Sequence, residues 1–130
     1  MQSGEIVLLK ELQHDRHVIG KYLRVTGSVT MLDFARRVCQ IEHTDHVVWV
    51  DLTLIDLAAL GLKEASLVQF IGEIRNADER STPIGPTDNG RIPFYLQAKV
   101  ARVVDGLDMT LYEQALMSRR DFLKRGDQKR

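Results

Sequence analysis

Cysteine and long apolar runs are nearly absent from this sequence, and each absence excludes a class of protein. Cys39 is the only cysteine among 130 residues, so the chain cannot form an intramolecular disulfide or a cysteine-rich metal cage. The longest uninterrupted apolar run in the first thirty residues covers residues 6–9. That run is too short for the core of a signal peptide and far too short for a membrane span. We therefore expect a soluble chain of a reducing, intracellular compartment.

The sequence also lacks an excess of charge of either sign. Eighteen Lys and Arg residues balance eighteen Asp and Glu residues. A neutral chain lacks the broad positive field of a protein that binds nucleic acid or an acidic membrane unaided. The balance conceals two unequal parts, because residues 119–130 hold six basic and two acidic residues, a net charge of +4, which leaves −4 for residues 1–118. The neutral total therefore combines an acidic domain with a basic tail.

The remaining composition, with 44% hydrophobic residues, is that of one ordinary globular domain. Five segments alternate between apolar and polar residues, which is typical of half-buried strands: residues 22–32, 37–42, 46–53, 67–76 and 94–104. Gly27, in the middle of the first segment, predicts a bulge or bend that lets one long strand join two sheets of a small barrel. The second and third segments form a predicted hairpin around the polar turn 43–45. The alternation directs these residues inward: Leu23, Val25, Val29, Met31, Cys39, Ile41, Val48, Val50, Leu52, Val68, Phe70, Ile74, Leu96, Ala98 and Val100.

Two helices are predicted from their capping signals. Thr53 begins a capping-box pattern and Gly61 supplies a left-handed stop, which places a short helix between the third and fourth strands. Thr110 and Glu113 form a second capping box, and Gly126 ends the helix that it begins. Five strands with a short helix between the third and fourth are the order of an all-β oligonucleotide/oligosaccharide-binding (OB) barrel, and another small barrel or an α+β domain is the alternative.

The expected organisation is therefore an N-terminal segment (1–20), a five-stranded barrel (21–105), a C-terminal amphipathic helix (108–126) and a basic tail (127–130). Residues 77–91, which contain proline and the turn pair Asn89-Gly90, are expected to form a mobile loop.

The C-terminal helix carries an apolar stripe with a basic residue, Arg119, projecting from its middle. Such a stripe can anchor a second helix from a partner, or it can fold back and plug its own barrel. Aromatic and arginine residues dominate interface energies, which favours the partner. The candidate interface residues of the helix are Leu111, Tyr112, Ala115, Leu116, Arg119, Phe122 and Leu123.

Outward-facing strand residues and the turn residue Arg36 are the candidates for contact with single-stranded nucleic acid. Trp49 and Tyr95 are predicted stacking platforms, and Arg36, Arg75 and Lys99 are predicted phosphate partners. The alternative for Trp49 is that it covers a small core under the N-terminal segment. Since several of the eight aromatic residues must lie in the core, we expect weak DNA binding by the isolated chain.

No metal site, cofactor site or enzymatic activity is predicted. His14 and His17 flank Asp15, and His43 and His46 flank a turn, where solvated polar ends explain their spacing better than zinc ligation does. No nucleophile elbow, phosphate-binding loop or dinucleotide fingerprint occurs in the sequence.

Two stretches carry a resemblance to a known family: residues 20–27 (GKYLRVTG) and residues 99–116 (KVARVVDGLDMTLYEQAL). In the second, a strand passes through an acidic-Gly turn into the helix that begins the C-terminal segment. Together they resemble the smallest OB-fold subunit, "Ten", of the telomeric CST complex, which is similar to the smallest subunit of replication protein A. The likeness covers residues 20–125 and transfers no function to residues 1–19 or to the loop 77–91.

The resemblance implies a non-enzymatic subunit that pairs with the Stn subunit through the C-terminal helices of both. The pair would join a large multi-OB subunit, bind single-stranded telomeric DNA, protect chromosome ends in the nucleus and assist the primase–polymerase in filling in the lagging strand. Arg24 and the stripe around Leu116 and Phe122 match positions at the Stn interface. The alternative is an autonomous single-stranded nucleic-acid-binding module of the replication protein A small-subunit type.

Overall fold

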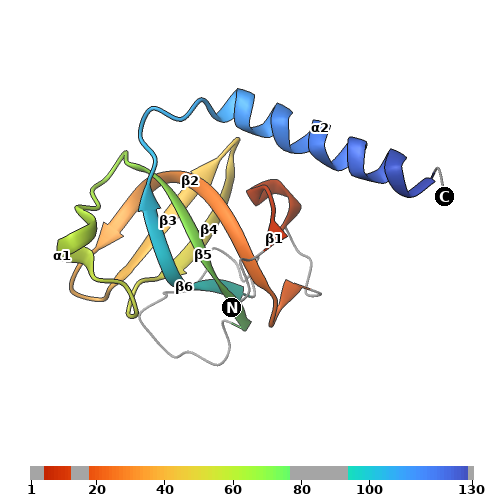
Figure 1. Cartoon of the computed structure of the whole chain (residues 1–130). Helices are drawn as coiled ribbons and strands as arrows, with labels where there is room; N and C mark the ends of the chain where they lie inside the picture. The colour runs from red at the N-terminus through yellow and green to blue at the C-terminus, as the bar shows by residue number, and fades with distance from the viewer. Residues whose placement is uncertain (1–4, 13–17, 77–93, 129–130) are drawn as a thin grey trace.

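Six strands and two α-helices make up the computed structural model, which describes residues 5–12, 18–76 and 94–128, with the side chains of the last helix described as far as Leu123. The elements in chain order are β1 (Glu5–Ile6), the 3-10 helix η1 (Leu9–Glu11), β2 (Tyr22–Asp33), β3 (Val38–His43), β4 (His46–Asp51), α1 (Leu57–Leu60), β5 (Leu67–Asn76), β6 (Phe94–Val103) and α2 (Met109–Gln128). Figure 1 shows the strands wrapped into a barrel, with α2 crossing one side of it and projecting beyond.

The strands close into a barrel because β2 pairs with two neighbours. The sheet order is β1-β2-β3-β4-β6-β5, and β2 also pairs with β5, which closes a ring of five strands. β4 and β6 are parallel, with Val50 opposite Leu96, whereas the other pairs of the ring are antiparallel. The all-β OB barrel, with a short helix between its third and fourth strands and a C-terminal helix, is confirmed.

Gly27 lies where β2 changes partners. Residues 22–28 pair with β5 and residues 28–33 pair with β3. A Cβ atom on Gly27 would approach the carbonyl oxygen of Glu42 to 3.1 Å and Cδ1 of Leu9 to 3.2 Å, so the close packing at this bend favours glycine. The predicted role of β2 in joining two parts of the barrel is confirmed by this change of partners, whereas the register irregularity lies between Val29 and Met31 and not at Gly27.

The inward faces of the strands form the core as the alternation predicts, except at Met31 and in the second half of β6. After the irregularity between Val29 and Met31 the alternation of β2 shifts by one, so Leu32 packs against the core and Met31 is outside the core cluster. Ile41, Val50 and Phe70 are fully buried in one cluster that also contains Cys39. Burial raises the pKa of the Cys39 thiol to about 12, so this thiol stays protonated at neutral pH.

The second half of β6 departs from the prediction. Val100 is exposed rather than inward, because the pairing with β5 is irregular between Ile71 and Gly72 and gives β6 one extra residue. A Cβ atom on Gly72 would collide with the carbonyl group of Gln97, so the bulge depends on glycine at this position. After the bulge the alternation shifts by one, and Ala101 and Val103 pack against the core instead.

Residues 5–12, within the expected N-terminal segment, pack against the five-stranded barrel. β1 pairs in parallel with β2, with Ile6 opposite Arg24. Leu9 and Leu12, on and beside η1, are buried in the main core cluster. We call residues 5–12 the strap.

Both helices begin at an aspartate rather than at the predicted threonine. The Asp56 side chain accepts a hydrogen bond from the Ala59 amide, and Asp108 Oδ1 accepts from the amides of Thr110 and Leu111. The predicted caps at Thr53 and Thr110 are therefore wrong, whereas the left-handed stop at Gly61 is confirmed by its φ of 67°. α2 continues past Gly126 to Gln128. Within the described residues, neither helix combines the length and the apolar character that crossing a membrane requires.

Candidate partner-binding surface

The apolar residues of α2 lie on two faces of the helix. Tyr112, Leu116 and Arg120, spaced by four residues, face the barrel, and Leu116 is only 9% exposed. The Tyr112 hydroxyl is buried, and no hydrogen-bond partner for it exists among the described residues. The single stripe predicted from the sequence is therefore divided, because its Tyr112 and Leu116 pack on the chain's own barrel.

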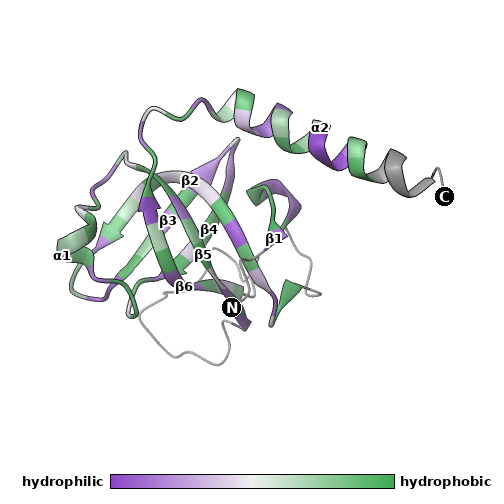
Figure 2. Cartoon of the chain, in the orientation of Figure 1, coloured by the Kyte–Doolittle hydropathy of each residue, from purple (hydrophilic) through white to green (hydrophobic). Residues whose placement is uncertain are grey.

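A second apolar face of α2 is exposed and is not covered by the described part of the barrel. Leu111 is 61% exposed, Phe122 is 74% exposed and Ala115 lies between them. At 3.6 residues per turn these three side chains fall within about 40° of one another around the helix axis. We call them the outer stripe. Figure 2 shows hydrophobic bands on α2 between hydrophilic ones along the part that projects past the barrel.

A pocket of about 400 Å³ lies beside α2, where the helix faces the strap and β2. It contains four of the predicted interface residues, namely Arg24, Leu116, Arg119 and Leu123. Glu5, Ile6 and Arg120 complete its lining, and Arg120 is paired with Glu11 of the strap. We call it the arginine pocket, because three arginine side chains line it next to two leucine side chains. Arg24 and the C-terminal helix, which the resemblance assigns to a partner interface, thus line one pocket, and their contact with a partner stays a prediction.

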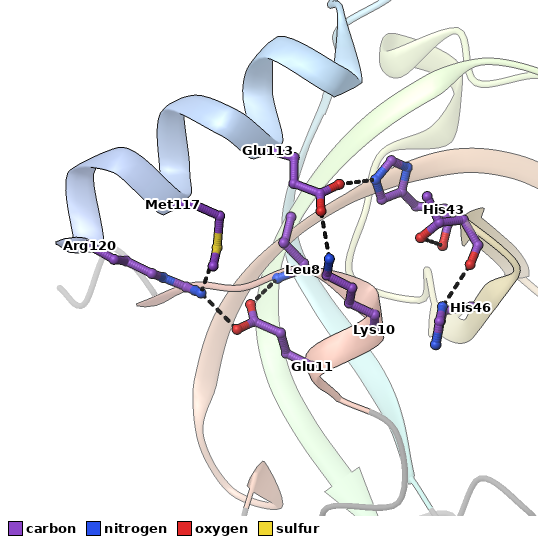
Figure 3. Close-up of polar contacts among 9 residues, drawn as sticks. Leu8, Lys10, Glu11, His43, His46, Glu113, Met117 and Arg120 are labelled. Carbon is purple, nitrogen blue, oxygen red and sulfur yellow. Dashed lines mark hydrogen bonds and ion pairs between the residues drawn. The ribbon is translucent and has the colours of Figure 1, made fainter.

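Glu113 links the first half of α2 to two other elements (Figure 3). Its carboxylate accepts a hydrogen bond from Lys10 Nζ at 2.6 Å and lies 3.3 Å from Nε2 of His43 at the end of β3. The hydrogen bonds from Lys10 and His43 hold the pKa of Glu113 below its ordinary value. The carboxylate therefore stays ionised at neutral pH and ties α2 to the strap and to the β3–β4 hairpin.

Arg120 links the second half of α2 to the strap. Its Nη1 donates to Glu11 Oε2 at 2.7 Å and its Nη2 donates to the Ile6 carbonyl oxygen at 2.7 Å (Figure 3). The other Glu11 oxygen accepts from the Leu8 amide at 2.7 Å. Burial acts to raise the pKa of Glu11, but the hydrogen bonds from Arg120 and Leu8 outweigh burial and hold this pKa below its ordinary value. The hydrogen bond to Glu11 raises the pKa of Arg120.

Trp49 and Tyr95, the two residues predicted to stack on bases, pack in the same small apolar cluster. Tyr95 is only 4% exposed and forms a small cluster with Val38, against which the half-buried Trp49 packs. The expected exposure of Tyr95 is therefore wrong, because its ring has no free face for a base. Trp49 does cover a small core, but that core consists of Val38 and Tyr95 and not of the strap.

Each of the predicted phosphate partners already has a polar partner within the chain. Arg36 is paired with Asp33, with Nε 3.8 Å from the carboxylate, and Arg75 is 3.7 Å from Glu73. Lys99 Nζ lies 4.7 Å from the centre of the Tyr22 ring and contacts its hydroxyl. Contact of these residues with DNA stays a prediction.

Two features of the surface were missed by the sequence analysis. Phe34, in the turn between β2 and β3, is exposed near Arg36 in the sequence. The sequence indicates this exposure only in that Phe34 lies outside the alternating segments. The contacts of Lys10 and Glu11 with α2 had no signal in the sequence, because they join residues more than a hundred positions apart.

The histidines of the β3–β4 hairpin have local roles. Thr44 and Asp45 form a two-residue turn with φ of 47° and 65°, and His46 Nδ1 lies 2.7 Å from the Thr44 carbonyl oxygen. Within the described residues no three His, Cys, Asp or Glu side chains lie together as metal ligands would. The predicted pair His14 and His17, with Asp15, lies outside the described residues.

A family model described as a telomere-capping CST complex subunit matches residues 1–126. The chain belongs to this family. The resemblance predicted from residues 20–27 and 99–116 is confirmed, and the match also includes the strap, to which the resemblance transferred no function. Members of the telomere-capping family are structural subunits of the CST complex and not enzymes.

Solved structures of the telomere-capping family share the fold. Telomere capping protein Ten1 from Saccharomyces pombe superposes with a TM-score of 0.66 at 15% sequence identity, covering 92% of this chain and 99% of that chain. The S. pombe Stn1–Ten1 complex gives a TM-score of 0.67 at 15% identity, covering 92% and 94%. A putative aspartyl-tRNA synthetase from Leishmania major Friedlin matches with a TM-score of 0.57 at 12% identity, covering 80% of this chain and 21% of that one. No curated protein sequence matches the chain significantly.

Proposed function

We propose that this chain is the Ten-type subunit of a CST complex and that it binds a Stn-type subunit through the outer stripe of α2 and the arginine pocket beside it. The exposure of Leu111 and Phe122 carries the proposal, since large apolar side chains at helical spacing lose contact with water when a partner helix covers them. The similarity to a chain of the S. pombe Stn1–Ten1 complex supports a partner of this kind.

The two parts of the surface have complementary roles in this proposal. Burial of the Leu111 and Phe122 side chains would contribute about 1.5–3 kcal/mol each through the hydrophobic effect. Arg119, which is exposed at the arginine pocket, would select a partner helix that places an acidic side chain beside its apolar contact. Leu123 extends the apolar surface from the outer stripe toward this pocket.

Substitution of the outer stripe tests the proposal. Leu111→Ala combined with Phe122→Ala should weaken binding to a co-expressed Stn subunit at least about a hundredfold, because buried anchor residues contribute roughly 2 kcal/mol or more each. The free chain should keep its unfolding transition, since both side chains are exposed in it.

Met117→Ala is the matched control. Met117 is a large apolar side chain that is 48% exposed, but it lines a groove with His43 and Thr44 on the other flank of α2. Binding to the Stn subunit by isothermal titration should be unchanged in this variant. Equal affinity of the outer-stripe variant and the wild-type chain would contradict the proposed function.

The wider role that we propose follows from membership in the telomere-capping family. The heterodimer joins a large multi-OB subunit at chromosome ends in the nucleus, where the complex binds single-stranded telomeric DNA and supports lagging-strand fill-in by the primase–polymerase. In this role the chain acts on DNA mainly through the complex, since its own predicted phosphate partners are each engaged locally.

A further inference from the structure

The strap has one side in the barrel and the other against α2. Leu9 and Leu12 are buried in the core, and β1 hydrogen-bonds to β2, so the strap is fixed to the barrel. Its polar residues Lys10 and Glu11 point toward α2, where they meet Glu113 and Arg120 (Figure 3). The strap therefore connects the barrel to both halves of the helix.

The apolar contact between α2 and the barrel is small. Leu116 is the one buried side chain among the described residues of α2, whereas Leu111, Met117, Phe122 and Leu123 are exposed. A single helix in water is stabilised chiefly by the face that it packs against a core, so a helix with little apolar contact depends on its other contacts. For α2 these are the hydrogen bonds and ion pairs of Glu113 and Arg120.

The strap also builds part of the surface that the partner would meet. Glu5 and Ile6 line the arginine pocket opposite Leu116 and Leu123, and Arg120 Nη2 donates to the Ile6 carbonyl oxygen across it. Displacement of α2 from the strap would separate the two walls of the pocket. It would also change the angle at which the outer stripe leaves the barrel.

We propose that the strap is a latch that orients α2 for its partner before the partner binds, with Lys10 and Glu11 as positioning residues. The inference rests on the proposed function, in which α2 binds a Stn-type helix. If only the latched orientation binds, the fraction of latched chains multiplies the apparent association rate, and the bound complex dissociates as before. A positioning role thus differs from direct contact, whose loss would raise the dissociation rate.

The first measurement uses the free chain. Lys10→Gln combined with Glu11→Gln removes both strap charges from the latch, while the side-chain amide introduced by Glu11→Gln keeps an oxygen that can accept from the Leu8 amide. We expect amide hydrogen exchange of α2 to become at least about fivefold faster, with the barrel strands unchanged. Glu42→Gln, which removes an exposed carboxylate from β3 outside the latch, is the matched control and should leave α2 exchange unchanged.

The second measurement adds the Stn subunit in stopped-flow or surface-based kinetics. The Lys10→Gln/Glu11→Gln chain should associate about three- to tenfold more slowly and dissociate at the wild-type rate, and Glu42→Gln should match the wild type. Unchanged α2 exchange would overturn the latch, and faster exchange with an unchanged association rate would overturn its role in binding. Failure of the proposed function has a different signature, because the outer-stripe variant would then bind normally.

Discussion

The Tyr112 hydroxyl has an uncommon position among the polar groups of the described chain. It is buried on the barrel-facing side of α2, and no group of the described residues forms a hydrogen bond with it. An unpaired buried hydroxyl has lost its water without gaining a partner, which costs free energy of folding. The ring itself contributes apolar contact beside Leu116. The Tyr112 ring therefore stabilises the fold, whereas its hydroxyl destabilises it.

Tyr112→Phe should consequently leave the free energy of unfolding unchanged or raise it by up to about 1 kcal/mol, because the substitution removes only the unpaired hydroxyl. Urea unfolding followed by circular dichroism measures this difference. Tyr22→Phe is the matched comparison, since it removes a hydroxyl that Lys99 contacts and should not stabilise the chain. A loss of more than about 1 kcal/mol for Tyr112→Phe would show that this hydroxyl has a partner in solution.

At the scale of the element, the N-terminus of α2 depends on Asp108. One carboxylate oxygen accepts from two amides, those of Thr110 at 3.0 Å and Leu111 at 3.1 Å. Asp108→Ala should destabilise the first turn of α2 by about 1 kcal/mol, which is the usual loss for a removed cap. Amide hydrogen exchange at Tyr112 and Glu113 measures the change. Thr110→Ala is the control, and a larger effect for Thr110 than for Asp108 would contradict the observed cap.

The capping pattern in the sequence selected the wrong residue for the start of α2. Asp108 and Thr110 are both residues that cap helices, and the Thr-x-x-Glu pattern favoured Thr110. The position of the helix start was decided by the turn that leaves β6, where Gly106 has a φ of 92° and the Leu107 amide donates to the Val104 carbonyl oxygen. This turn brings Asp108 to the cap position before Thr110 is reached.

The alternation of apolar and polar residues predicted the inward residues correctly in strands that contain no bulge. The inward residues of β3, β4 and β5 agree with the structure, because their alternation continues unbroken. The alternation of β6 failed beyond Ala98, since the bulge opposite Gly72 arises from the geometry of two paired strands and has no mark in β6 itself. A glycine within β5 was the one available hint.

The sequence predicted which residues of the C-terminal helix are candidates for the interface, but not which of them face the barrel and which face solvent. Helical spacing selected Tyr112 and Phe122 together, although one faces the barrel and the other faces away. Spacing gives the angle between side chains and says nothing of where the helix docks. That position depends on Glu113 and Arg120, whose partners Lys10 and Glu11 lie in a segment without a predicted role.

At the scale of the whole molecule, the neutral net charge is the sum of an acidic body and a basic end. Residues 119–130 hold six basic and two acidic residues, and the described part of this end includes Arg119 and Arg120 at the arginine pocket. Arg120 is neutralised by Glu11, and on the barrel Arg36 and Arg75 are each close to a carboxylate. Cations that are paired within the chain release few counterions from DNA, so they add little to the affinity for a polyanion.

The free chain should therefore bind single-stranded DNA weakly, with Kd above about 1 µM at physiological salt, in the range typical of non-specific binding. Fluorescence anisotropy with a labelled oligothymidine at several salt concentrations measures both affinity and salt dependence. With about two phosphates or fewer neutralised, log K should fall with log salt at a slope shallower than about −1.5. Lys99→Gln should change this slope little, since Lys99 is engaged with Tyr22. Nanomolar binding with a steep slope would instead identify an autonomous nucleic-acid-binding module, like the smallest subunit of replication protein A, in which the local ion pairs open to receive the strand.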